Sequence, residues 1–199
     1  HAESGRVYIK GTEVHIKNPQ DAINHGIGLL TEDRKASGCF LPLGVKENII
    51  MPTVKQFKKT IFVDDKRIEE EAEKQKKNLG IKATSLEQHI VYLSGGNQQK
   101  ALVARWLVNN PDVLIVDEPT RGIDVNAKAE IHKKLCELAN QGKAIIMVSS
   151  EMPEVIGMSD RIYIMHEGEM TGELKRNEFS QELIVKMASL SKTQLNEGR

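Results

Sequence analysis

The sequence of 199 residues has few aromatic residues, no net charge and only two cysteines. Proteins that bind nucleic acid usually carry an excess of basic residues, so the balanced charge disfavours that class. The cysteines, Cys39 and Cys136, are isolated, which is typical of a reducing cytoplasm rather than of a disulfide framework. Because no stretch approaches 18 continuous apolar residues, the sequence predicts no membrane-spanning helix.

The sequence also lacks the loop G-x-x-x-x-G-K-[ST] that cradles phosphates in many nucleotide-binding proteins. It nevertheless contains the segment LSGGNQQK at residues 93–100, in which a serine and two glycines lead into an apolar helix. Ser94 can cap that helix, and Gly95 and Gly96 leave backbone N–H groups open to an anion. The segment therefore predicts a phosphate-binding turn or, as the simpler alternative, a serine cap after a glycine turn.

Alternating strand and helix patterns predict an α/β protein with a parallel core. The runs at 113–117 and 144–148 are continuous and apolar, which is typical of buried parallel strands. Amphipathic helices are expected from Asn97 to a stop at Asn110 and over residues 127–141. The other expected elements are a hairpin around Gly11, a helix that starts at Pro19, a strand at 26–30, a loop at 34–40, a hairpin around Gly168 and a helix at 181–190.

The segment DDKRIEEEAEKQKKNLG at residues 64–80 predicts a highly charged helix that ends at Gly80. Its apolar stripe is thin and consists of Ile68, Ala72 and Leu79, so most of the helix is expected to face solvent. Ion pairs are expected between Glu70 and Lys74 and between Glu73 and Lys77.

Two acidic residues, Asp117 and Glu118, follow the apolar run at 113–116. They are expected at the carboxyl end of a buried strand, where open α/β sheets bind their ligands. One carboxylate there can hold Mg²⁺ through water, and its neighbour can polarise an attacking water molecule. The alternative is that the two acids only terminate the strand.

Residues 93–124, LSGGNQQKALVARWLVNNPDVLIVDEPTRGID, resemble as one block the signature-to-Walker-B region of ABC-type ATPases. The resemblance implies a P-loop NTPase fold of the ABC ATPase kind with a helical sub-lobe. It further implies that the signature is formed by Leu93, Ser94, Gly95, Gly96, Asn97 and Gln98, that Walker B is formed by Val113 to Asp117, and that Glu118 is the catalytic glutamate. The D-loop would then be Gly122 to Asp124, the Q-loop would be Thr31 to Asp33, and the switch region would be Ser149 to Glu151.

The segments NPQDAINHGIGLLTEDRK, LSGGNQQK, DEPTRGIDV and VSSEMPEVIGMSDRI further resemble the second ATPase domain of bacterial monosaccharide importers. In that family ATP lies between two domains, and the signature of one closes over ATP held by the other. The resemblance thus implies Mg-ATP as the cofactor, ATP contacts from the signature residues and Asp124, metal contacts from Asp117 and Glu32, and catalytic roles for Glu118 and Ser150.

The resemblance extends from Glu3 to about Leu190, and it places the family's phosphate-binding loop shortly before ESGRVYIKG. We therefore expect the chain to be a fragment of a longer protein and to form one truncated ABC ATPase domain. Its segments are expected to be an N-terminal part at 1–37, a helical sub-lobe at 38–110 and the remaining core at 111–199. A missing central strand should leave apolar sheet edges exposed.

Two residues depart from the family pattern. Glu32 stands where most members have glutamine, and an ionised carboxylate cannot donate a hydrogen bond. Ser150 stands where most have a histidine that contacts the γ-phosphate, and serine cannot carry positive charge. We therefore expect the chain's own Walker B site to be weak and its signature turn to serve the partner's ATP, while the fragment alone is expected to be inactive.

The expected partners are the first ATPase domain of the same subunit or a second copy, membrane permease subunits bound through the sub-lobe, and indirectly a sugar-binding protein, at the cytoplasmic face of the membrane. No nucleic-acid partner is expected. A non-catalytic dimerisation or regulatory module is an alternative, and a soluble non-transport ABC ATPase is another. The latter would require a basic face or a long coiled-coil insertion, and neither is present in the sequence.

Overall fold

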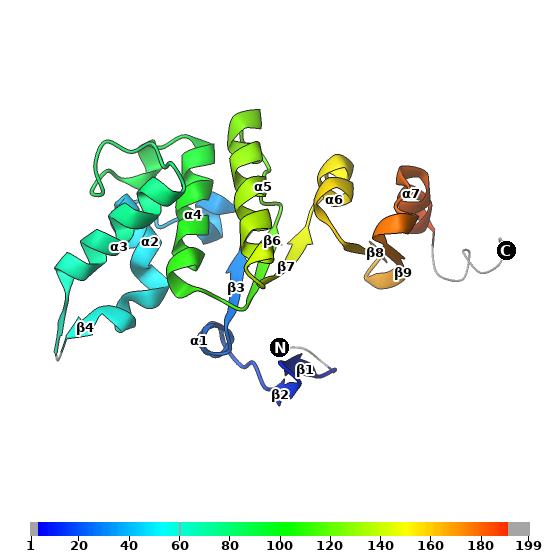
Figure 1. The fold of residues 1–199 in the computed structure, drawn as a ribbon, viewed down its shortest axis with the longest axis horizontal. Helices are drawn as coiled ribbons and strands as arrows, with labels where there is room; N and C mark the ends of the chain where they lie inside the picture. The colour runs from blue at the N-terminus through cyan, green and yellow to red at the C-terminus, as the bar shows by residue number, and fades with distance from the viewer. Residues whose placement is uncertain (1–3, 60, 191–199) are drawn as a thin grey trace. The chain divides into compact units, whose positions relative to one another are not determined.

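The computed structural model describes residues 4–59 and 61–190 (Figure 1). The predicted segments and the resemblance also include residues 1–3, 60 and 191–199, which lie outside the described residues. The chain divides into two compact units, one ending at Val148 and the other beginning at Ser149, and each is described by itself. The division into segments at residues 37 and 110 stays a prediction.

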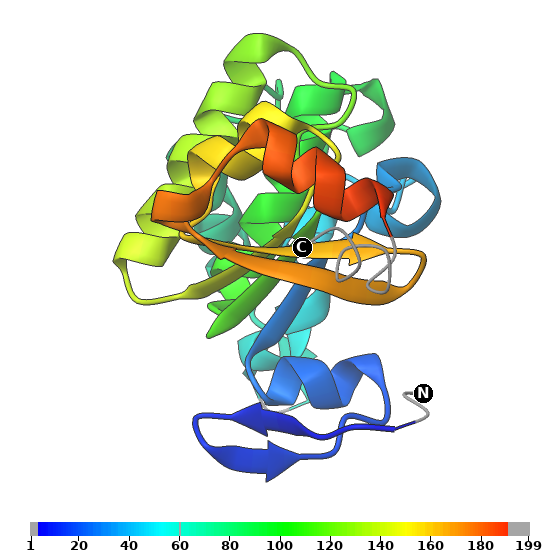
Figure 2. The same cartoon turned by 90° about the vertical axis from the view of Figure 1, so that its right-hand side faces the viewer.

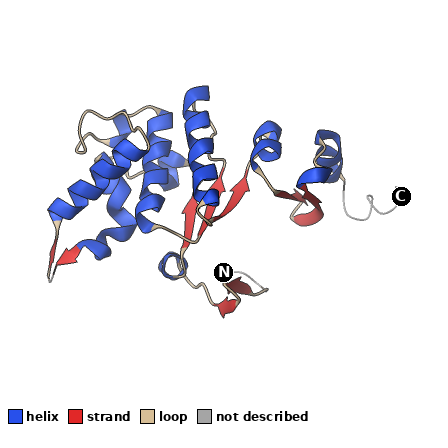
Figure 3. Ribbon diagram, viewed as in Figure 1, coloured by secondary structure: helices blue, strands red, loops and turns tan. Residues whose placement is uncertain are grey.

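A three-stranded parallel sheet forms the centre of the first unit (Figure 3). Its strands are β3 (Ile27–Leu30), β6 (Val113–Asp117) and β7 (Ala144–Val148), in that order across the sheet. The register places Asp117 beside Val148, so the predicted acidic strand end lies level with the end of β7. These findings confirm the predicted α/β architecture with a parallel core.

The prediction that residues 144–148 form a fully buried strand was wrong. Strand β7 is the edge of the three-stranded sheet, and Ile146 and Val148 are each 52% exposed. The apolar run correctly indicated a strand, but whether a strand is buried depends on neighbouring elements that the run itself does not specify.

Two helices pack beside the sheet and beside each other, namely α4 (Gly95–Asn109) and α5 (Val125–Asn140). Helix α4 begins two residues before the predicted start at Asn97, because Ser94 provides the N-cap. It ends at Asn110, which adopts the left-handed conformation with φ of 49°. Helix α4 packs closely on β3, since a Cβ atom added at Gly28 would lie 2.8 Å from the Trp106 ring.

The helical sub-lobe packs α2 (Val45–Ile50) and α3 (Asp65–Asn78) against α4. Its buried core includes Ile49, Ile68 and Ala72, which confirms the thin apolar stripe predicted for α3. The shorter elements of the sub-lobe are the 3₁₀ helices η2 (Met51–Phe57) and η3 (Ile90–Tyr92) and the strands β4 (Lys58–Lys59) and β5 (Phe62–Val63).

One predicted ion pair of α3 was wrong. Glu73 contacts Lys77 at 3.9 Å as predicted, but Lys74 pairs with Glu71 at 3.0 Å rather than with Glu70. Glu70 instead lies 3.9 Å from Lys66. Exposed side chains of this kind choose among several partners at nearly equal free energy, so spacing alone does not select the pair.

The N-terminal part contains the predicted hairpin of β1 (Val7–Ile9) and β2 (Thr12–Val14), followed by α1 (Pro19–Asn24). Helix α1 starts at Pro19 as predicted, and Asn18 caps it, because the Asn18 side chain accepts a hydrogen bond from the Asp21 N–H. The segment predicted as a loop at 34–40 instead contains a short π-helix, η1 (Arg34–Gly38).

The second unit consists of α6 (Met152–Met158), an antiparallel pair β8 (Arg161–His166) and β9 (Glu169–Lys175), the 3₁₀ helix η4 (Arg176–Glu178) and α7 (Gln181–Ser189). Figure 2 shows α7 lying against the β8–β9 hairpin. Ile162, Ile164, Leu174 and Ile184 form its small core. Among the residues that the structure describes, no helix combines the length and the apolar character needed to cross a bilayer.

Candidate functional site

The turn before α4 is fixed by a short network of hydrogen bonds. Ser94 Oγ accepts hydrogen bonds from the Asn97 backbone N–H at 3.4 Å and from Asn97 Nδ2 at 2.9 Å. The Asn97 side chain in turn accepts a bond from the Lys82 backbone N–H at 2.8 Å. The first turn of a helix of 15 residues therefore lies beside an exposed serine, with the positive end of the helix dipole at that point.

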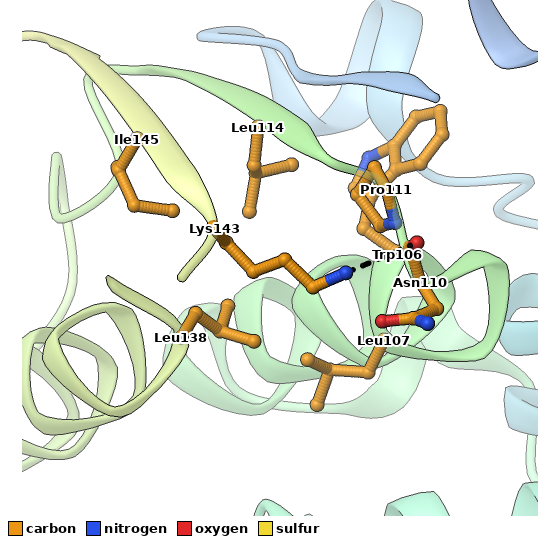
Figure 4. A pocket seen from close by; sticks show the side chains of 8 residues that line it. All are labelled: Trp106, Leu107, Asn110, Pro111, Leu114, Leu138, Lys143 and Ile145. Atoms are coloured by element: carbon orange, nitrogen blue, oxygen red, sulfur yellow. Dashed lines mark hydrogen bonds between the residues drawn. The ribbon is translucent and has the colours of Figure 1, made fainter. Parts of the chain in front are cut away.

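An open groove of about 360 Å³ borders this turn and is lined in part by Lys82, Tyr92 and Ser94. The groove is large enough for part of a nucleotide. Figure 4 shows a different cavity, enclosed by α4, α5 and the start of the sheet, in which Lys143 Nζ donates to the Asn110 carbonyl at 3.5 Å. That cavity measures about 20 Å³, so it has room for little more than one water molecule.

Both glycines of the turn lie where a side chain would collide with a neighbour. A Cβ atom added at Gly96 would lie 2.6 Å from Ala127 Cβ on α5. One added at Gly95 would lie 3.2 Å from Arg34 Nη2 and 3.3 Å from the Gly122 carbonyl oxygen. The two glycines thus allow the turn to approach α5 and the loop that precedes it.

Two buried cations hold α4 in place behind the turn. Lys100 Nζ donates to the Gly80 carbonyl at 3.2 Å and forms an ion pair with Glu130 on α5. Arg105 donates to the Asn48 carbonyl at 2.7 Å and to the Gly38 carbonyl at 2.9 Å, and burial lowers the pKa of its guanidinium. A buried charge must be compensated, and here carbonyl oxygens compensate that of Arg105.

Asp124 lies beside the same turn, from the start of α5. Its Oδ1 accepts a hydrogen bond from the Ala127 N–H at 3.0 Å, and its Oδ2 would be 3.4 Å from a Cβ atom at Gly96. The Ala127 N–H is the main reason why the pKa of Asp124 is lowered. Asp124 is therefore an ionised helix cap next to the turn.

The loop after β3 reaches the same region from another part of the chain. The Glu32 carboxylate forms an ion pair with the guanidinium of Arg121, in the loop after β6. Arg34 Nη1 donates to the Arg121 carbonyl at 2.6 Å. Glu32, the turn at Gly95 and the loop before Asp124 are thus brought together in the first unit.

The acidic pair lies at the carboxyl end of β6, as predicted. Asp117 and Glu118 are both half-buried there. Glu118 has φ of 46°, which is uncommon for a residue with a side chain and marks local backbone strain. Its N–H donates to the Val148 carbonyl at 2.8 Å, so the strained residue is tied to the end of β7. Ser150 belongs to the second unit, and its catalytic role stays a prediction.

The sequence profile of the ABC transporter family matches residues 1–121, more than half of the chain. This chain belongs to the ABC transporter family. Its folding pattern agrees with that of solved ATP-binding cassettes, so the P-loop NTPase fold class predicted from the sequence is confirmed.

Two relatives of this ABC transporter chain are named as ribose/galactose/methyl galactoside import ATP-binding proteins. The protein from Geobacillus kaustophilus is 55% identical over 94% of the chain, and the match covers 37% of that relative. The protein from Halalkalibacterium halodurans is 53% identical over 94% of the chain, and the match covers 36% of that relative. The chain therefore spans little more than a third of the length of these relatives.

Two solved structures share the fold. A nucleotide-free ATP-binding cassette from an ABC transporter is 22% identical, with a TM-score of 0.76 over 96% of this chain and 78% of the other. A dimeric cassette in a post-hydrolysis state, bound to ADP and Pi, is 23% identical, with a TM-score of 0.74 over 89% of this chain and 75% of the other.

Sequence reasoning did not assign a role to four cationic side chains of this ABC transporter chain: Arg34, Lys100, Arg105 and Arg121. Arg34 and Arg121 stand directly beside the segments TED and Gly122–Asp124 that the resemblance had marked, and that adjacency is the signal that could have found them. Lys100 ends the marked segment LSGGNQQK, whereas Arg105 lies in the apolar helical pattern after it and carries no such signal.

The acidic side chains fit magnesium unequally. Asp117 offers the carboxylate oxygens that Mg²⁺ prefers, whereas the carboxylate of Glu32 is already paired with Arg121. Among the described residues, no group of three or more His, Cys, Asp or Glu side chains could hold a metal ion. A magnesium ion in this part of the ABC transporter chain would therefore need further oxygen ligands, such as phosphates, in addition to Asp117.

Proposed function

We propose that this chain is an energy-coupling ATPase domain of a sugar importer, and that its turn at Ser94 completes an ATP site formed with a partner ATPase domain. The observation that carries this proposal is the turn itself. An exposed serine cap, two glycines packed against neighbouring segments and a helix N-terminus adjoin an open groove. Such an arrangement suits a phosphate that arrives from outside the chain.

The names of the relatives support the choice of a sugar as the transported substrate, because they refer to ribose, galactose and methyl galactoside import. Under this proposal the phosphate of Mg-ATP binds at Ser94, Gly95, Gly96 and Asn97, with Leu93, Gln98 and Asp124 supporting the turn. The partner is the other ATPase domain of the same subunit or a second copy. The sub-lobe binds the permease at the cytoplasmic face of the membrane, and a sugar-binding protein acts through that permease.

The chain's own acidic site is proposed to contribute less. Asp117 would hold Mg²⁺ and Glu118 would orient the attacking water, while Mg²⁺ bound with ATP would neutralise the phosphates. Pairing of Glu32 with Arg121 supports a weak metal site, since the carboxylate oxygen is engaged by a guanidinium. Ser150 lacks the positive charge that would stabilise the transition state.

The test is steady-state Mg-ATP hydrolysis by the full-length subunit that contains this chain. Ser94→Ala is expected to abolish most activity, whereas Glu118→Gln is expected to cost much less. The matched control is Ser180→Ala, because Ser180 caps α7 through the corresponding hydrogen bond, which it accepts from the Leu183 N–H at 3.4 Å. Equal losses from Ser94→Ala and Glu118→Gln would contradict the asymmetry, and equal losses from Ser94→Ala and Ser180→Ala would reduce Ser94 to a helix cap.

The chain by itself is expected to bind nucleotide very weakly, since it lacks the G-x-x-x-x-G-K-[ST] loop. Titration with a fluorescent ATP analogue tests this expectation, and micromolar affinity would contradict it. A non-catalytic dimerisation or regulatory module remains the second candidate, and the engaged Glu32 carboxylate favours it. It would be supported if the full-length subunit formed its domain pair but both Ser94→Ala and Glu118→Gln left hydrolysis unchanged.

A further inference from the structure

The loop that contains Glu32 has an unusual local structure. A single π-helical turn, η1, follows Asp33, whose Oδ1 accepts hydrogen bonds from the N–H groups of Lys35 and Ala36, each at 2.9 Å. These two donors are the main reason why the pKa of Asp33 is lowered. Short π-turns occur often at functional sites, and this one sets the direction in which Arg34 leaves the backbone.

The Arg34 side chain bridges segments that are far apart in sequence. Its Nη1 donates to the carbonyl of Arg121, 87 residues away, at 2.6 Å. Its Nη2 lies 3.2 Å from the position of a Cβ atom at Gly95 and 3.6 Å from that of one at Gly122. One guanidinium therefore contacts the loop after β6 and closely approaches the proposed phosphate-binding turn.

A second arginine connects this contact back to Glu32. The Arg121 backbone accepts the bond from Arg34, while the Arg121 side chain forms the ion pair with Glu32. If Glu32 moved away from Arg121, the Arg121 side chain would be released. Its backbone carbonyl is the group that accepts the hydrogen bond from Arg34. The sequence of contacts runs from Glu32 through Arg121 and Arg34 to Gly95.

The hydrogen-bonding capacity of the Arg34 side chain is only partly used. Arg34 Nε and Gln99 Oε1 are both buried, and neither has a hydrogen-bond partner within the described part of the chain. Gln99 lies one helical turn after Gly95, on the face of α4 that η1 packs against, since Leu102 on that face meets Gly38. Each unsatisfied buried group costs about 1–3 kcal/mol, which is a reason for this contact to exchange readily with another arrangement.

We propose that Arg34 is a positioning residue, which sets the place of the turn at Ser94–Asn97 in response to the engagement of Glu32 with Arg121. The proposal rests on the function proposed above, in which that turn binds a phosphate of ATP. Arg34 acts through the turn and the loop beside it. A glutamine at position 34 keeps a hydrogen-bond donor but loses the positive charge and the planar arrangement of several guanidinium donors. A lysine keeps the charge but loses that planar arrangement.

The first experiment measures kcat and KM for Mg-ATP in the full-length subunit. Arg34→Gln is expected to lower kcat about tenfold and to change KM less than about threefold, because misplacement of the turn matters most in the transition state. Arg34→Lys is expected to recover less than about threefold of that loss, since one ammonium cannot replace two guanidinium nitrogens. The matched control is Arg6→Gln, because Arg6 is 70% exposed and contacts only Glu13 among the ion pairs described.

A double-mutant cycle separates positioning from independent effects. If Glu32 acts through Arg34, Glu32→Gln should change kcat in the wild-type background and have little further effect when Arg34→Gln is present. The proposal would be overturned if the fold-changes in kcat of Glu32→Gln and Arg34→Gln multiplied in the double variant. It would also be overturned if Arg34→Gln were as active as Arg6→Gln.

Hydrogen–deuterium exchange of the same proteins provides a readout that does not depend on activity. Arg34→Gln should speed exchange in peptides containing Gly95–Asn97 and leave the C-terminal half of α5, in the same unit, unchanged, whereas general destabilisation of that unit would speed exchange in both. Unchanged exchange at the turn would overturn the proposal. Failure of the proposed function would look different, because the wild-type subunit would not hydrolyse ATP or Ser94→Ala would be fully active, while the exchange experiment would still test Arg34.

Discussion

Helix α4 lies close to α5 at Gly96, and this contact allows a quantitative prediction about stability. Replacement of Gly96 by alanine would put the new Cβ atom 2.6 Å from Ala127 Cβ. Carbon atoms in contact normally lie about 3.5–4.0 Å apart, so the two helices would have to separate by about 1 Å. Backbone of two long helices cannot yield as a flexible side chain can, so we expect Gly96→Ala to destabilise the chain.

The expected magnitude follows from opposing contributions. Overpacking a well-packed contact costs typically about 1–3 kcal/mol, while replacing glycine by alanine in a helix favours folding by up to about 1 kcal/mol. The clash dominates because Ala127 is 6% exposed and has no open space around it. The net loss in the free energy of unfolding should therefore be about 1–2 kcal/mol.

A second substitution tests whether the clash is the cause. Ala127→Gly alone should cost about 1–2 kcal/mol, through lower helix propensity and loss of one buried methyl group. In the double variant Gly96→Ala with Ala127→Gly, the clashing pair no longer exists, and the nearest remaining neighbour of the new Cβ is Asp124 Oδ2 at 3.4 Å. The double variant should therefore be more stable than the sum of the single changes predicts, by about 1–2 kcal/mol.

The assay is urea unfolding of the four proteins, with m-values compared to confirm that the transition itself is unchanged. Additive losses, or a Gly96→Ala variant as stable as the wild type, would refute the steric argument. The result also bears on activity measurements. A loss of ATP hydrolysis in Gly96→Ala would reflect helix packing, so Ser94 is the better position at which to test phosphate binding.

Three further predictions concern other contacts of the first unit. Arg105→Ala should lower the free energy of unfolding by about 3 kcal/mol, because it leaves the buried carbonyls of Gly38 and Asn48 without their donor. Arg105→Lys, measured by the same unfolding assay, should recover part of that loss. The pKa of Asp124 is lowered in the folded chain, so the contribution of its carboxylate to stability is full above the ordinary pKa and is lost as pH falls through the folded value. Asp124→Asn keeps a capping oxygen and should therefore flatten the decline in stability below about pH 4. An unchanged acid profile of stability would argue against an ionised cap. Glu118→Gly should raise the melting temperature, because glycine adopts φ of 46° without the cost of about 1 kcal/mol that a side chain incurs. A lower melting temperature would show that contacts of the Glu118 side chain outweigh the strain.

Periodicity predicted the elements of the fold that depend on local pattern. The apolar run before Asp117 indicated a parallel strand, and the amphipathic pattern over residues 127–141 indicated α5, whose buried face includes Ile131, Leu135 and Leu138. Prediction failed where neighbours decide the outcome. Ile146 is exposed because it lies on the same face of the sheet as Leu29, which is 47% exposed, whereas Leu114 and Val116 on the opposite face are buried; no property of the run itself contains that information.

The candidate site was predictable only in part. Ser94 was found because a capping residue has a local signature, and Asp124 because the resemblance to ABC ATPases marked Gly122 to Asp124; the structure places both beside the turn. The π-turn at Arg34–Gly38 was missed because the side chain of Asp33 stabilises it, whereas the polar residues around it read as a loop. Arg34 and Arg105 were missed because their acceptors lie at least 57 residues away in sequence.

The two buried cations of α4 have a mechanical consequence. Lys100 and Arg105 are five residues apart, which corresponds to about 7.5 Å along the axis and about 140° around it. Lys100 binds the end of α3 and α5, while Arg105 binds α2 and the end of η1. Helix α4 is thus fixed at two heights and from two directions, and it is bound both to the sub-lobe and to α5. A displacement of the sub-lobe relative to α5 would therefore strain the Lys100 contacts to Gly80 and Glu130, which lie directly behind the turn at Ser94.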